Sequence, residues 1–199
     1  MKIITFAGSK GGTGKTTNSH AAAHGLVMLG IPTAYVLTDN RELPSDESRV
    51  YSIIDGRTIG QLEQAVATAK SHDGPGVLVV DGGGNRGPVD ELIISVADLA
   101  ILPFCASGDD VTTVAKDMAR FTNAFAMPSN WTTNAKAKVV DQGYIADMEE
   151  VYPGRVLKPM SETHALKDLI LLNFNGSLLP PAQRYCRSLA RVVLELLER

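Results

Sequence analysis

The segment FAGSKGGTGKTTNSHAAAHGL, residues 6–26, concentrates four glycines and two lysines in residues 8–15. The β-branched and apolar run KIITFA at residues 2–7 predicts a strand before it, and residues 15–29 predict a helix after it, ending at Gly30. Glycine loses more conformational freedom on folding than any other residue, so such a turn is poor material for a core. The composition therefore indicates that a ligand approaches the bare main chain.

Residues 8–16, here called the phosphate loop, fit the pattern G-x-x-x-x-G-K-[ST]. The backbone N–H groups of such a loop point at phosphates, and the amino end of the following helix adds partial positive charge. We predict that Lys15 reaches the β- and γ-phosphates of ATP and that the Thr16 hydroxyl is a ligand of Mg²⁺. The predicted nucleotide-binding residues in and after the loop are Gly11, Gly12, Thr13, Gly14, Lys15, Thr16 and Thr17.

Two acidic residues lie at the ends of predicted strands. Asp81 closes the apolar run VLVVD at residues 77–81, and Asp39 follows the run TAYVLT at residues 33–38. The carboxyl ends of parallel strands share one edge of a sheet, where ligands bind in open α/β folds. Asp39, Asp81 and the phosphate loop should therefore meet in one crevice. There Asp81 either holds the shell of Mg²⁺ through water or caps the next helix.

Strands and helices alternate along the chain. The remaining predicted strands cover 49–54, 99–104, 125–130 and 155–158, and the remaining predicted helices cover 59–71, 88–96, 109–126, 134–150, 162–171 and 180–198. The continuous apolar run at 77–81 is typical of a parallel strand that is covered on both faces. The alternation predicts an α/β protein with the three-layer P-loop NTPase fold, a mostly parallel sheet with helices on both faces.

The length and composition suit one domain over residues 1–199, because 44% of the 199 residues are hydrophobic. Cys105 and Cys186 are far apart, which favours reduced thiols over a disulfide framework. No leader-like start is present, and no apolar run approaches the ~20 residues that span a bilayer. We therefore expect a cytoplasmic protein that has no membrane partner. The net charge of −3 argues against a dedicated nucleic-acid binder but allows a local basic patch.

Lys10 is not required by the general phosphate-binding pattern. With it, residues 10–17, KGGTGKTT, resemble the deviant Walker A motif, KGGxGKTT, of the ParA/MinD family of ATPases. The segments ADLAILPFCASGDD at 97–110 and VLKPMSETHAL at 156–166 also look like parts of that family. The resemblance implies an ATP-dependent homodimer that acts in plasmid or chromosome partition, together with an adaptor protein that stimulates hydrolysis.

The resemblance also implies roles for individual residues. Lys10 would cross a nucleotide-sandwich dimer to the partner's phosphates, where an extra cation acts only once the dimer has closed. The alternative interpretation is that Lys10 is a solvated surface lysine. The predicted catalytic residues are Lys10, Lys15 and Asp39. Asn130 would read the adenine or else belongs to a turn, and Pro159 would flank the base.

Two positions depart from the family pattern. The family usually ends its second strand with Asp-x-Asp, whose second acid orients the attacking water, and here Arg41 stands at that position. Either Asp39 takes the roles of both acids, or Glu42 or Asp110 helps to orient the water, or turnover is slow. Where the family often has Thr-Pro-Pro, three glycines at 82–84 follow Asp81, which suits either a switch or a flexible turn.

Arg184, Arg187 and Arg191 are spaced i, i+3 and i+7 in the last predicted helix, so they share what we call the basic face. The basic face either binds DNA phosphates without reading sequence or is simply solvated. His20 and His24 also share a helix face, but without the acid of an H-E-x-x-H pattern they do not indicate a metal site.

The sequence therefore predicts a ParA-like ATPase that uses ATP and Mg²⁺. An alternative is a nucleotide-gated binding module that hydrolyses slowly or not at all, such as an accessory protein of conjugative DNA transfer, and Arg41 favours it. A metabolic ATPase of the same superfamily is less well supported, because no extra substrate pocket is evident in the sequence.

Overall fold

The computed structural model describes residues 1–83, 87–132, 134–161 and 164–199. These residues form a six-stranded sheet in the order β3-β2-β4-β1-β5-β6, in which all neighbouring strands are parallel. The strands are β1 (Lys2–Phe6), β2 (Thr33–Leu37), β3 (Ser52–Asp55), β4 (Val77–Asp81), β5 (Leu99–Phe104) and β6 (Ala124–Pro128). The predicted α/β class is confirmed, with a sheet that is parallel throughout rather than mostly parallel.

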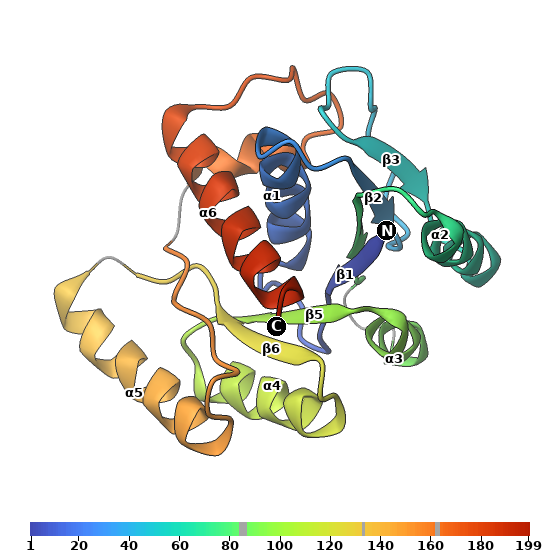
Figure 1. The fold of residues 1–199 in the computed structure, drawn as a ribbon. Coiled ribbons are helices and arrows are strands. Elements are labelled where there is room, and N and C mark those ends of the chain that lie inside the picture. The colour runs from blue at the N-terminus through green and yellow to red at the C-terminus, as the bar shows by residue number, and fades with distance from the viewer. Residues whose placement is uncertain (84–86, 133, 162–163) are drawn as a thin grey trace.

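Helices cover both faces of the sheet, which gives three layers (Figure 1). One face carries α1 (Lys15–Met28), α6 (Pro180–Leu197) and the short 3₁₀ helix η1 (His164–Ile170). The other face carries α2 (Ile59–Ser71), α3 (Gly87–Val96) and α4 (Gly108–Arg120), and α5 (Ala135–Val151) packs beside α4.

The strands bury side chains on both faces, as the continuous apolar runs predict. In β1, Ile4 and Phe6 join the core beneath α1 and α6, whereas Ile3 joins the core beneath α2 and α3. In β5, Ile101 faces the first of these cores, and Leu102 faces a core shared with α4. The alternation of side chains along each strand therefore attaches both helical layers to the central sheet.

Four predicted elements differ from the structure. The strand predicted at 49–54 is β3, which begins only at Ser52. Residues 155–158 add no strand to the sheet, because Val156 forms only an isolated bridge with Ala126. The helix predicted over 109–126 ends at Arg120, because residues 124–128 pair with β5 as strand β6. The helix predicted over 162–171 is the 3₁₀ helix His164–Ile170, and residues 162 and 163 lie outside the described ranges.

The register of the sheet brings the predicted site together. Phe6 and Leu37 both stand opposite Asp81, one on each side of β4. The phosphate loop leaves β1 directly after this point, and residues 38–41 leave β2 at the same edge. Because all three strands are parallel, their carboxyl ends open on one side of the sheet.

Candidate functional site

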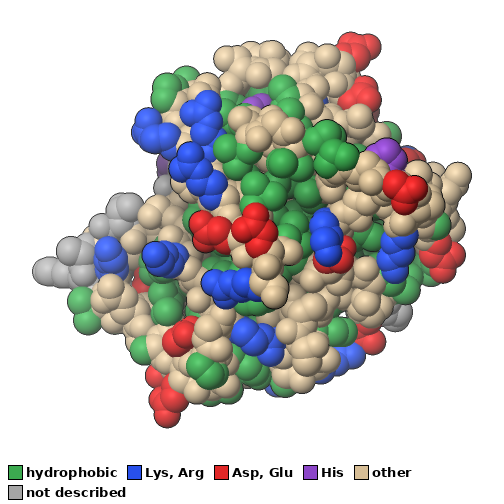
Figure 2. Space-filling view, in the orientation of Figure 1, with side chains coloured by type: hydrophobic (Ala, Val, Ile, Leu, Met, Phe, Trp, Pro, Cys, Tyr) green, Lys and Arg blue, Asp and Glu red, His purple; other side chains and the backbone are tan. Residues whose placement is uncertain are grey.

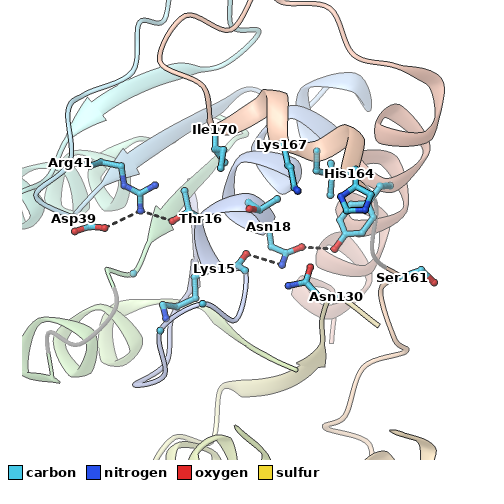
Figure 3. A pocket seen from close by; sticks show the side chains of 17 residues that line it. Lys15, Thr16, Asn18, Asp39, Arg41, Asn130, Ser161, His164, Lys167 and Ile170 are labelled. Atoms are coloured by element: carbon cyan, nitrogen blue, oxygen red, sulfur yellow. Dashed lines mark hydrogen bonds and ion pairs between the residues drawn. The ribbon is translucent and has the colours of Figure 1, made fainter. Parts of the chain in front are cut away.

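A cavity of about 550 Å³ lies at this edge of the sheet. Its walls come from the phosphate loop, the first turn of α1, the loop after β2, η1 and Tyr185 of α6 (Figure 3). This volume falls within the range of small-molecule sites, roughly 300–1,000 Å³. The cavity therefore combines the predicted phosphate-binding residues with segments from the last third of the chain.

The phosphate loop leaves its main chain bare toward open space. No atom lies within 4 Å of where a Cβ on Gly11 or Gly12 would be. Gly12 and Gly14 have φ values of 78° and 92°, in the left-handed region that favours glycine. Gly14 is the residue before α1, so the amino end of that helix faces the loop. This arrangement fits a phosphate chain held by backbone N–H groups and a helix dipole.

Lys15 is buried, and its ammonium group turns back on the loop. Nζ donates a hydrogen bond of 2.5 Å to the carbonyl oxygen of Lys10. Burial lowers the pKa of Lys15, while the nearby carboxylates, Asp90 and Asp81 first among them, partly offset this effect. The side chain therefore lies folded against the loop that a phosphate would occupy, with acidic groups around it.

Asp81 is fully buried at the end of β4. Its Oδ2 accepts a hydrogen bond of 2.7 Å from the Tyr35 hydroxyl, and its Oδ1 accepts one of 3.2 Å from Ser19 Oγ. Burial raises the pKa of Asp81, and the hydrogen bond from Tyr35 and the charge of Arg41 act in the opposite direction. The carboxylate is thus oriented by side chains of α1 and β2.

The Thr16 hydroxyl and the Asp81 carboxylate, which were predicted to organise the metal, lie around one side chain together with Asp39. Arg41 Nη2 donates to Thr16 Oγ1 over 2.6 Å and to Asp39 Oδ2 over 3.0 Å, and it lies 3.7 Å from Asp81 Oδ2. A hydroxyl and two carboxylates form the all-oxygen ligand set that Mg²⁺ prefers. The residues present therefore fit a magnesium ion held by Thr16 and Asp81, either directly or through water, with the Asp39 carboxylate beside them.

Lys10 contacts acidic residues of its own chain. Its Nζ pairs with Asp109, and it lies 3.3 Å from Asp110 Oδ1, in the first turn of α4. Lys10 is therefore ion-paired rather than freely solvated. Asp110 also accepts hydrogen bonds from the hydroxyl of Ser107, the N-cap residue of α4, and from the backbone N–H of Cys105. Neither Asp110 nor the exposed Glu42 lines the cavity.

Several positioning residues carry no signal in the sequence. Asp117 of α4 accepts hydrogen bonds from the backbone N–H and the hydroxyl of Ser9, which anchors the phosphate loop. Asn18 donates to the Gly14 carbonyl over 2.9 Å and accepts a 2.6 Å hydrogen bond from the Tyr185 hydroxyl. The contacts with Asp117 and Tyr185 join residues 108 and 167 positions apart, so no local pattern could have predicted them.

The two residues predicted to contact the base lie in different places. Asn130 lines the cavity after β6, and its φ of 53° is in the left-handed region, which asparagine tolerates better than most residues. Pro159 is exposed and does not line the cavity. Both roles stay predictions. Ser161, Lys167 and Ile170 also line the cavity and were not predicted (Figure 3).

The basic face is exposed on α6, while the apolar side of the same helix packs against α1. Figure 2 shows Lys and Arg side chains gathered over the first half of α6 and acidic side chains beside its second half. Within the described ranges, no helix has both the length and the apolar character needed to cross a bilayer. His20 and His24 lie in a buried aromatic cluster with Tyr51.

Comparison with known proteins gives matches in both sequence and fold. No family model matches the chain. The chain is 30% identical over 122 residues to the protein ParA of Rhizobium radiobacter, across 59% of this chain and 55% of that protein. It therefore spans about half the length of this curated relative.

Solved structures share the fold over nearly the whole chain. The cell division protein MinD of Aquifex aeolicus superposes with a TM-score of 0.74 at 17% identity, over 98% of this chain and 97% of that one. A plasmid partition protein of Borrelia burgdorferi bound to AMPPNP gives a TM-score of 0.65 at 16% identity, over 98% of each chain. At these identities the likeness establishes the fold.

Proposed function

We propose that this chain is a P-loop ATPase of the ParA/MinD family, which binds and hydrolyses ATP with Mg²⁺ and acts in plasmid or chromosome partition. One observation carries the proposal. One cavity at the carboxyl edge of the sheet is lined by the bare phosphate loop, Lys15, Thr16 and Asp39. Asp81 lies next to it, 3.7 Å from Arg41. The AMPPNP bound by the Borrelia protein of the same fold supports a nucleotide as the ligand.

Each residue of the cavity has a role in this proposal. The N–H groups of the phosphate loop and the Lys15 ammonium bind the phosphates, and Asp117 holds the loop in place through Ser9. Thr16 and Asp81 hold Mg²⁺, which would neutralise charge on the phosphate oxygens. Asp39 positions the attacking water, because it is the only carboxylate among the described residues that line the cavity.

Calorimetry with ATP and Mg²⁺ tests the nucleotide site. We expect the natural protein to bind and the Lys15→Ala variant to bind at least about tenfold more weakly, because a buried cation beside the phosphates is lost. Lys70→Ala, on the exposed surface of α2, is a matched control that should bind as the natural protein does. Absence of heat from the folded natural protein would refute the proposal.

A slow or non-hydrolysing nucleotide-gated module is the second candidate. The observation that favours it is Arg41, which stands where the family's second acid is expected and contacts Asp39. Steady-state phosphate release separates the two candidates, with Lys15→Ala as the blank. Turnover above the blank supports the ATPase, and turnover equal to the blank in a protein that binds ATP supports the module.

The partition role also includes a homodimer and non-specific binding to DNA. The exposed basic face of α6 supports the DNA contact, since arginines that touch phosphates need not read the bases. The extra lysine of the phosphate loop supports the dimer through its resemblance to the family motif. An adaptor protein that stimulates hydrolysis is part of the same proposal, and the name of the Rhizobium relative supports it only by analogy.

A further inference from the structure

Arg41 lies among the oxygen atoms that would hold the metal. One of its nitrogens, Nη2, contacts Thr16 Oγ1, Asp39 Oδ2 and Asp81 Oδ2 at 2.6, 3.0 and 3.7 Å. Figure 3 shows the side chain reaching from the loop after β2 into the space between Asp39 and Thr16. A single cationic group therefore contacts the Thr16 hydroxyl and the Asp81 carboxylate, which are proposed to hold Mg²⁺, and the Asp39 carboxylate beside them.

The charges explain why a cation is needed there. Asp81 has no exposed surface, and Asp39 is only partly exposed. The Thr16 hydroxyl oxygen accepts a hydrogen bond from Arg41 Nη2. Two carboxylates that converge on one point repel each other unless a positive group lies between them. Without a metal, the guanidinium of Arg41 supplies that charge.

This contact differs from an ordinary arginine–carboxylate pair. Arg57, which is about as exposed, binds both oxygens of the single carboxylate of Asp55 at 2.9 and 2.7 Å, and its Nη1 donates to the Arg41 carbonyl oxygen. Arg41 instead presents one nitrogen to a hydroxyl and two separate carboxylates. That is a cation's coordination pattern rather than the two-pronged recognition of a single carboxylate.

We propose that Arg41 is a built-in substitute for the metal ion, which occupies the oxygen cluster without Mg²⁺ and withdraws when Mg²⁺ binds there. The proposal rests on the proposed function, because it concerns the same site. The Arg41 side chain is 36% exposed, so it can turn toward solvent without disturbing the buried core. Mg²⁺ must then compete with Arg41, and the site takes up metal less readily than its oxygen ligands alone would allow.

Thermal unfolding without nucleotide tests whether Arg41 takes the place of the metal ion. The proteins are the natural chain, Arg41→Gln, and Arg120→Gln as the control, since Arg120 pairs with Glu91 on α4 and α3 and does not line the cavity. In buffer containing a chelator, we expect Arg41→Gln to melt below the natural protein. Added Mg²⁺ should raise its midpoint more than it raises those of the other two. Equal responses to Mg²⁺ in all three would overturn the proposal.

ATP binding at increasing Mg²⁺ gives a second readout. The half-saturating Mg²⁺ concentration should fall about tenfold in Arg41→Gln, because one competing charge-assisted contact is removed. Arg41→Lys keeps the charge and should stay nearer the natural protein, so equal values for the two variants would contradict the proposal. If the natural protein binds no ATP at any Mg²⁺ concentration, the proposed function itself fails. If it binds ATP and the Arg41 variants share its Mg²⁺ dependence, only the role of Arg41 fails.

Discussion

His20 occupies a site in which the fold disfavours its charged form. The ring stacks on Tyr35 with centroids 4.1 Å apart, and Nδ1 lies 2.7 Å from the Tyr51 hydroxyl. Arg49 donates to that same hydroxyl over 2.8 Å. Burial lowers the pKa of His20 well below 6.5, and the positive charges of Arg49 and Arg41 lower it further. The ring thus contacts neutral phenols, and the charges that act on it are positive.

The protein should lose stability in acid partly through His20. Below pH 6.5 the unfolded chain binds a proton at this histidine that the folded chain excludes, so the free energy of unfolding falls as the pH falls. One such proton accounts for about 1.4 kcal/mol per pH unit. Chemical unfolding at pH 7.5 and 5.5 should show a loss about 1 kcal/mol smaller in His20→Gln. The same pH dependence in both proteins would contradict the expectation.

The contact between α1 and α6 depends on one glycine. These helices lie side by side on one face of the sheet (Figure 1). A Cβ on Gly25 would lie 2.0 Å from the carbonyl oxygen of Cys186 and 3.0 Å from the Cβ of Ala190. Glycine within a helix lowers stability relative to alanine. Its presence here indicates that the close approach of α6 stabilises the protein by more than the glycine costs.

Gly25→Ala should separate the two helices and lower the free energy of unfolding by about 2 kcal/mol or more, because a backbone carbonyl cannot move aside as a side chain can. Gly143→Ala is the matched control, since no atom lies within 4 Å of a Cβ at that exposed position of α5. It should stabilise the protein by about 0.5–1 kcal/mol through helix propensity alone. Urea unfolding of both variants measures the difference, and a Gly25→Ala protein as stable as the natural one would disprove the close contact.

Lys10 connects the structure of one chain to the proposed dimer. In the described structure it pairs with Asp109 and Asp110 of its own α4. To reach the phosphates of a partner, it must exchange these carboxylates for phosphate oxygens. The exchange is favourable only where a triphosphate presents more negative charge than the two aspartates, so closure of the dimer would depend on the nucleotide.

Lys10→Ala should therefore bind ATP about as well as the natural protein and yet remain monomeric with ATP and Mg²⁺. Asp109→Ala, which removes one competing partner from Lys10, should dimerise at lower protein concentration. Light scattering after size exclusion, with a non-hydrolysable ATP analogue, measures both. A Lys10→Ala protein that dimerises normally would show that this lysine does not join the subunits.

DNA binding by the assembled protein should depend on the basic face. Arg187→Glu reverses one charge at its centre and should abolish the retention of DNA that occurs with ATP, and the natural protein should lose this retention steeply as salt rises. Lys70→Glu changes the net charge equally but lies on α2, across the sheet, and should retain DNA. Equal retention by both variants, measured in a salt series, would exclude the basic face.

Local patterns predicted most of the fold. Continuous apolar runs indicated β4 and β5 to the residue, and β1 and β2 to within one residue, because a strand buried on both faces needs apolar side chains at successive positions. The 3₁₀ helix η1 and the bridge at Val156 were predicted as an ordinary helix and a strand. The bridge depends on hydrogen bonds between Ala126 and the distant residues Arg155 and Leu157, which a local pattern does not contain.

For the site, the sequence alone determined the phosphate loop and the convergence of Asp39 and Asp81. Glycines at a fixed spacing indicate where a ligand contacts the backbone. Parallel strands bring their carboxyl ends to one edge of the sheet. Only the tertiary structure decided the partners of Arg41 and Lys10 and the anchoring of the loop by Asp117. An ion pair or hydrogen bond between distant segments depends on distance and burial, and neither quantity exists until the chain has folded.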